Sequence, residues 1–147
     1  LVLLLKYGGL VSLLGMEESG AAWSLLLIPM ISRWSMVVAL SAFTYGRIEG
    51  LGHAFHQGSV AWSTAVASVI VVVAAVLLGG VGGAGMFAGA TVIAWFLGWA
   101  MASRFGGLTG DTYGAVNEII EVLALAAAVA MLPPGWVEPL TQFLDLT

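Results

Sequence analysis

The sequence has 147 residues, of which 61% are hydrophobic and 8% are charged, and its mean hydropathy is +1.06. Soluble domains carry roughly 25% charged residues, so this composition excludes an ordinary water-facing surface and predicts a polytopic membrane protein. The net charge of −4 argues against nucleic acid as a partner, and the lack of cysteine excludes disulfides and thiolate metal sites.

The first hydrophobic segment, residues 1–14, is shorter than the roughly 20 residues that a helix needs to cross a bilayer. It begins at Leu1 inside an apolar run and lacks the charged lead-in of a signal peptide. We therefore expect the chain to start within a truncated spanning helix of a longer protein. Lys6 either snorkels to the interface from the helix end or faces the protein interior.

Residues 21–43 are long enough to span a membrane and contain Pro29 and Arg33. Pro29 lacks a backbone N–H and is expected to kink the helix. Arg33 is costly in a membrane unless it meets a carboxylate, a phosphate or water. It is therefore either a structural salt-bridge partner or a functional cation facing a polar cavity, and we favour the functional cation.

A polar loop, residues 44–59, follows and contains Arg47, His53 and His56. Two histidines without a third strong ligand are weak support for zinc, so we predict no zinc site here. The positive-inside rule places this loop in the cytoplasm, together with the later loop that follows Arg104.

Two further spans are expected at residues 60–78 and 85–103, joined by a glycine-rich turn at 79–84. Gly85 and Gly89 have the small-residue spacing that lets membrane helices approach closely. We interpret that spacing as a packing feature.

Polar and ionisable groups gather in residues 104–121. Its glycines allow tight turns and the close approach of a ligand; they are Gly106, Gly107, Gly110 and Gly114. A glycine-rich loop leading into a helix N-terminus suits phosphate, and neighbouring carboxylates suit Mg²⁺. Asn117, Glu118 and Glu121 fall on one face of the helix. The plain alternative is an interhelical loop with a capping Asp111.

The last apolar segment, residues 119–132, is shorter than a full span, which places Glu118 and Glu121 near or just inside the membrane boundary. The pattern as a whole predicts an all-α fold. It is a polytopic transmembrane helix bundle of about five hydrophobic segments, the first truncated, in a single integral membrane domain over residues 1–147.

The stretch Gly106-Gly-Leu-Thr-Gly-Asp-Thr-Tyr-Gly-Ala-Val-Asn-Glu-x-x-Glu121 closely resembles the C-terminal signature of the cobalamin synthase family, adenosylcobinamide-GDP ribazoletransferase. Leu4-Leu-Lys-Tyr-Gly8, Pro29-x-x-x-Arg33-Trp and Tyr45-Gly-Arg-x-Glu-Gly50 also occur in the order expected of that family. The resemblance implies a multi-pass enzyme of the bacterial or archaeal cytoplasmic membrane. It would join α-ribazole, or its 5′-phosphate, to adenosylcobinamide-GDP, release GMP and use Mg²⁺.

The resemblance, taken with the polar stretch, also names candidate site residues. The predicted catalytic groups are Asp111, Glu118, Glu121 and Arg33, and the three carboxylates among them are the predicted Mg²⁺ ligands. The predicted phosphate-binding residues are Arg47, Gly107, Thr109, Gly110 and Asn117. The Asp-rich segment of the family's N-terminal half does not occur in these residues. We therefore expect this chain to be a C-terminal part that is inactive alone.

Two other classes of function also account for some of the pattern. A transporter or channel subunit could use Arg33, Glu118 and Glu121 as an ion path. A non-catalytic membrane scaffold would have the Gly85–Gly89 spacing as its main feature. The sequence leaves a homo-oligomer open.

Overall fold

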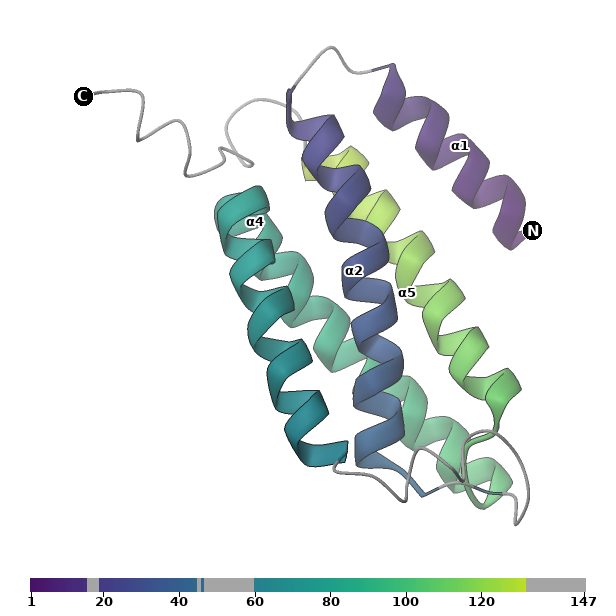
Figure 1. The fold of residues 1–147 in the computed structure, drawn as a ribbon. Helices are drawn as coiled ribbons and strands as arrows, with labels where there is room; N and C mark the ends of the chain where they lie inside the picture. Colours follow the sequence, from purple (N-terminus) through teal and green to yellow (C-terminus); the bar gives the residue numbers. More distant parts are fainter. Residues whose placement is uncertain (16–18, 45, 47–59, 132–147) are drawn as a thin grey trace.

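The structure is a computed structural model that describes residues 1–15, 19–44, 46 and 60–131. In chain order its elements are α1 (Val2–Leu14), α2 (Ser19–Ala42), α4 (Val60–Phe105) and α5 (Gly110–Met131). Figure 1 shows a bundle in which α2 contacts both α4 and α5, while α1 packs on α5. Within the described ranges, the prediction of an all-α bundle is confirmed.

Gly80 divides α4 into two arms. Its φ of 54° and ψ of −138° are values that a residue with a side chain rarely adopts. A straight helix of this length would extend about 69 Å, more than twice the roughly 30 Å of a bilayer core. The turn instead folds α4 into a hairpin (Figure 1). This confirms the two expected spans and the glycine-rich turn between them.

Among the residues that the structure describes, three helices are long and apolar enough to cross a membrane: α2, α4 and α5. The α4 segment covers 44 residues, enough for both arms of its hairpin to cross, whereas α1 is shorter than a span. Large apolar side chains face outward, including Val81 and Trp62, which are 87% and 72% exposed. Such a surface suits lipid rather than water, and the chain is a multi-pass membrane protein.

Trp34 of α2 ties the two arms of α4 together. Its indole Nε1 donates a hydrogen bond to Ser68 Oγ of the first arm at 3.0 Å. Its ring also packs on Phe87 of the second arm, with centroids 4.4 Å apart. The side chain is buried, and the apolar cluster around it includes Leu13 of α1, so all four helices contribute to one core.

The chain segments on either side of residues 47–59 and the loop before α5 meet at one end of the bundle. Leu108 N donates to Thr44 O at 3.0 Å, and Gly46 N donates to Leu108 O at 2.8 Å. The turn of the α4 hairpin lies at the opposite end (Figure 1). The prediction that both polar loops lie on one side is therefore confirmed for these segments. Arg47, His53 and His56 lie outside the described residues.

Helix α5 corrects one sequence-based prediction. The sequence places Asn117, Glu118 and Glu121 on a helix whose apolar part, residues 119–132, is shorter than a full span. That estimate of length was wrong, because α5 begins at Gly110 and its 22 residues form a full-length candidate span. Polar residues in its first two turns hid the start of the helix. As a consequence, Glu118 and Glu121 lie within the span rather than at its edge.

Candidate active site

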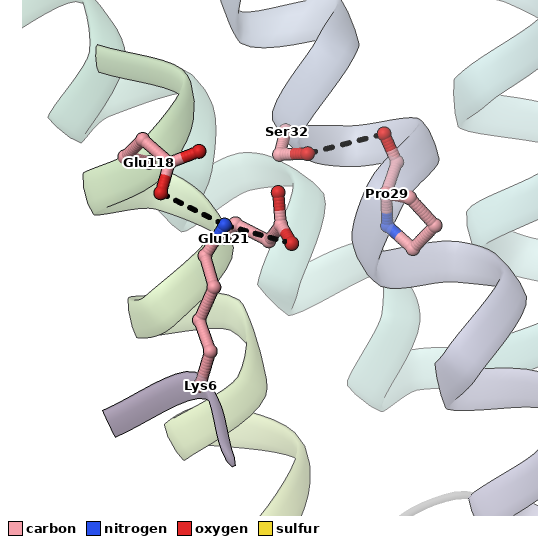
Figure 2. A network of polar contacts seen from close by, with 5 residues as sticks. All are labelled: Lys6, Pro29, Ser32, Glu118 and Glu121. Atoms are coloured by element: carbon pink, nitrogen blue, oxygen red, sulfur yellow. Dashed lines mark hydrogen bonds and ion pairs between the residues drawn. The ribbon is translucent and has the colours of Figure 1, made fainter. Parts of the chain in front are cut away.

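Lys6 of α1 bridges two carboxylates of α5. Its Nζ lies 3.0 Å from Glu118 Oε2 and 3.0 Å from Glu121 Oε1 (Figure 2). The side chains are partly buried, with exposed fractions of 22% for Lys6, 44% for Glu118 and 26% for Glu121. One lysine and two glutamates leave a net charge of −1. Of the two sequence interpretations of Lys6, the structure supports the one in which it faces the protein interior.

The two helices present these charges to each other because of their register. Glu118 and Glu121 are three residues apart and so share one face of α5. One turn further along both helices, Gly9 of α1 packs directly against the Leu125 side chain. A helix without a side chain at position 9 comes close enough to α5 for the Lys6 ammonium to reach both carboxylates.

The ion cluster lies well along the candidate span of α5, at its contact with α1. Glu118 is eight residues beyond Gly110, which puts it about 12 Å along the helix axis from the start of α5. Charged groups at such a depth are costly unless they are paired, and they usually mark a functional site. Paired charges inside an otherwise apolar helix therefore identify this place as the candidate active site.

Buried polar groups continue from the cluster into the bundle. Asn117 is 6% exposed, and its Oδ1 accepts no hydrogen bond from the described residues. On the neighbouring helix α2, the buried Ser32 donates from Oγ to the Pro29 carbonyl oxygen at 3.1 Å (Figure 2). A buried amide oxygen without a donor is costly in an apolar setting, which makes Asn117 a candidate ligand-binding group.

The loop before α5 forms a helix cap. Thr112 Oγ1 accepts a hydrogen bond from Thr109 N at 2.7 Å and donates to Thr109 O at 2.8 Å. The first of these bonds is one half of a capping box, in which the side chain at the third helical position satisfies the N–H of the N-cap residue, here Thr109. Asp111 is exposed in the first turn, where its charge complements the helix dipole.

The structure brings some of the predicted site residues together and separates others. Asp111 precedes Glu118 by seven residues, or about 10 Å along the helix axis. Within the described residues, no group of three or more acidic, histidine or cysteine side chains could hold a metal ion. Glu118 and Glu121 are therefore one pair, and Asp111 lies apart from them in the exposed first turn of α5.

Arg33 lies on the exposed face of α2 and makes no ion pair with the described residues. The structural salt bridge considered from the sequence does not form with the described residues, and a functional role for Arg33 stays a prediction. Gly107 and Gly110 both lie in the loop and cap, and Gly107 is buried against Gly46. Whether these residues bind phosphate stays a prediction.

Residues 1–129 match the sequence profile of the cobalamin-5-phosphate synthase family. The chain belongs to that family. The match covers α1, α2, α4 and nearly all of α5, and so includes every residue of the ion cluster. It confirms the resemblance seen in the sequence.

Relatives named adenosylcobinamide-GDP ribazoletransferase give the same family assignment. The protein from Roseiflexus sp. is 37% identical over 131 residues, covering 84% of this chain and 49% of its own length. A relative from Pseudomonas fluorescens is 39% identical over 127 residues, covering 85% and 50%. One from Syntrophobacter fumaroxidans is 40% identical over 118 residues, covering 78% and 46%. The chain thus spans about half the length of these relatives, and no solved structure matches it.

Lys6 belongs to the ion cluster, but the sequence analysis did not include it among the predicted site residues. It is the only lysine in the sequence and sits in an apolar helix. An isolated cation among apolar residues signals a buried partner. However, its partners lie more than 110 positions away, and local spacing does not identify them.

Proposed function

We propose that this chain forms part of a membrane transferase of the last step of cobalamin assembly. The enzyme joins α-ribazole, or its 5′-phosphate, to adenosylcobinamide-GDP and releases GMP. The observation that carries the proposal is the Lys6–Glu118–Glu121 cluster inside a span of a chain that belongs to the cobalamin-5-phosphate synthase family. The names of the relatives supply the substrate class.

The proposed reaction exchanges one phosphorus–oxygen bond for another. A free ribose hydroxyl oxygen of α-ribazole attacks the phosphorus that carries the cobinamide, and the bond from that phosphorus to the GMP oxygen breaks. The attacking hydroxyl is not the 5′-hydroxyl, because the 5′-oxygen is already esterified when the substrate is the 5′-phosphate. GMP leaves as a phosphate anion and needs no proton from the enzyme. The proton of the attacking hydroxyl must be accepted, and negative charge on the transferring phosphoryl group must be stabilised.

Side chains of the cluster fit these two tasks. A carboxylate of Glu118 or Glu121 accepts the hydroxyl proton and orients the attacking oxygen. The Lys6 ammonium provides positive charge near the phosphoryl oxygens. Asn117, which is buried beside the carboxylates with an unsatisfied Oδ1, holds a hydroxyl or amide donor of the substrate.

The donor set of Glu118 and Glu121 also fits Mg²⁺. This ion prefers oxygen ligands, and one or two protein carboxylates often suffice because water and substrate phosphates complete its shell. Outside the two ion pairs with Lys6, the remaining carboxylate oxygens make no hydrogen bond or ion pair with the described residues. When bound, Mg²⁺ neutralises charge on the phosphoryl oxygens. Asp111 would require a second site, since it lies two helical turns away.

The loop before α5 and the two arginines would bind the phosphate groups of the substrate. Backbone N–H groups at Gly110 and at the start of α5 suit phosphate oxygens, and Thr109 and Gly107 shape that loop. Arg33 and Arg47 would meet phosphate oxygens of the nucleotide. We place this end of the bundle on the cytoplasmic side of the cytoplasmic membrane, where nucleotide substrates are available.

The test is a transferase assay on membranes from cells that express the full-length gene product. The substrates are adenosylcobinamide-GDP and α-ribazole, and the products measured are GMP and the joined corrinoid. GMP release should require both substrates and Mg²⁺. Membranes that release GMP without α-ribazole, or that form no joined corrinoid, would contradict the proposal. Ion flux in vesicles without transferase activity would favour a transporter instead.

A further inference from the structure

Lys6 occupies the position between Glu118 and Glu121 that a bridging cation would take. Its single ammonium group lies at the same distance, 3.0 Å, from one oxygen of each carboxylate. The two carboxylates come from successive turns of α5 and converge on one point, as Figure 2 shows. At an equal distance the Coulomb attraction of two carboxylates is larger for a divalent cation than for an ammonium, because the Coulomb energy grows with charge.

The charge balance of the cluster also leaves room for a cation. Lys6 neutralises only one of the two carboxylates, and no other described basic side chain pairs with Glu118 or Glu121. The surrounding faces of α1 and α5 are apolar, with Leu5, Gly9 and Val122 nearby. A residual negative charge in such a place favours the uptake of a divalent cation.

We propose that Lys6 is an internal competitor for the divalent cation at Glu118 and Glu121, and a positioning residue for the transferase. In the metal-free protein its ammonium keeps the two carboxylates close together and stabilises the packing of α1 on α5. A divalent cation displaces the ammonium, which stays on its flexible stem beside the site. This inference rests on the proposed function only for the identity of the metal and of the reaction.

The first test measures Mn²⁺ binding to the purified full-length gene product in detergent. Mn²⁺ replaces Mg²⁺ because it takes the same oxygen ligands and its free form is counted by electron paramagnetic resonance. In Lys6→Met the apparent Kd should fall by about tenfold or more, since a site that Lys6 fills nine-tenths of the time is weakened about tenfold. The matched control is Tyr7→Phe, a change on an exposed neighbouring side chain that should leave the Kd as it is.

The same titration contains the outcomes that would overturn the inference. Unchanged or weaker Mn²⁺ binding in Lys6→Met, with wild-type helix content by circular dichroism, would show that Lys6 is only a tether. A complete lack of Mn²⁺ binding by both proteins would also overturn it.

A second measurement uses the wild-type protein and so does not depend on the folding of a variant. Lys6 is the only lysine of these 147 residues, so its peptide reports acylation by an amine-reactive reagent without ambiguity. Its labelling rate should rise several-fold on addition of Mg²⁺ and not on addition of K⁺ at equal ionic strength. An unchanged rate under Mg²⁺ would overturn the inference.

These readouts are independent of the transferase assay. Tighter Mn²⁺ binding in Lys6→Met without GMP release by the wild type would support the inference and contradict the proposed function. Transferase activity in the wild type, together with Mn²⁺ binding that Lys6→Met does not change, would support the proposed function and contradict the inference.

Discussion

Gly107 lies so close to Gly46 that a Cβ atom on Gly107 would come 2.5 Å from the Gly46 Cα. Two backbone hydrogen bonds lie beside this contact: Leu108 N donates to Thr44 O, and Gly46 N donates to Leu108 O. Gly107 also has a φ of 147°, which side-chain-bearing residues rarely adopt. This contact fixes the loop that leads into α5, and therefore the start of the helix that carries Glu118 and Glu121.

Gly107→Ala should destabilise the protein by about 1–3 kcal/mol, because the new methyl group overlaps backbone and the φ is strained. Thermal unfolding in detergent would show the loss as a lower Tm. The matched control is Gly110→Ala, where a Cβ meets open space and φ is not positive. Equal Tm values for the two variants would show that the Gly46–Gly107 contact does not constrain the loop.

The sequence predicted the spans because hydrophobic length is a local property. It also placed Glu118 and Glu121 on one helix face, since that follows from a spacing of three. The first turn of α5 was missed because Asp111 and Thr112 resemble loop residues. A helix accepts them when Thr109 and Thr112 cap its first turn and Asn117 is buried against a neighbour.

The partners of Lys6 and Arg33 were beyond sequence reasoning for a different reason. Which charge meets which depends on the rotation and register of helices that are distant in the chain. In the structure Lys6 takes the place beside the carboxylates, while Arg33 lies on the outer face of α2. An unpaired arginine in a span and an unpaired lysine in a short apolar helix look alike until the helices are packed.

Gly83 makes a second close backbone contact, inside the α4 hairpin. A Cβ on Gly83 would overlap the carbonyl oxygen of Ala75 on the other arm. Gly83→Ala should therefore open the hairpin and destabilise the protein by about 1–3 kcal/mol. Gly85→Ala is the control, because a Cβ there meets nothing within 4 Å. The measurement is Tm in detergent, and a Tm for Gly83→Ala no lower than that of Gly85→Ala would contradict the prediction.

The orientation of the bundle predicts a labelling pattern in intact cells. Thr44 lies at the end with the polar loops, and Val81 lies beside the turn of α4 at the other end. A membrane-impermeant thiol reagent should label Val81→Cys and spare Thr44→Cys. These residues contain no native cysteine, and any in the rest of the gene product is replaced by serine. Labelling of Thr44→Cys from outside would reverse the proposed orientation.

The arrangement of carboxylates predicts unequal effects of neutralising them. Glu121→Gln removes a charge from the Lys6 cluster and should lower the rate of GMP release by about 10²-fold or more, as the loss of a group that stabilises transition-state charge does. Asp111→Asn alters an exposed cap residue two turns away and should cost far less, although Asp111 was predicted from the sequence as a third metal ligand. The assay is GMP release across a Mg²⁺ titration, with the amount of folded protein matched by circular dichroism. Equal losses for the two variants, both rescued by higher Mg²⁺, would instead place all three carboxylates on one metal. Near-normal rates of GMP release for both variants would show that neither carboxylate takes part in catalysis.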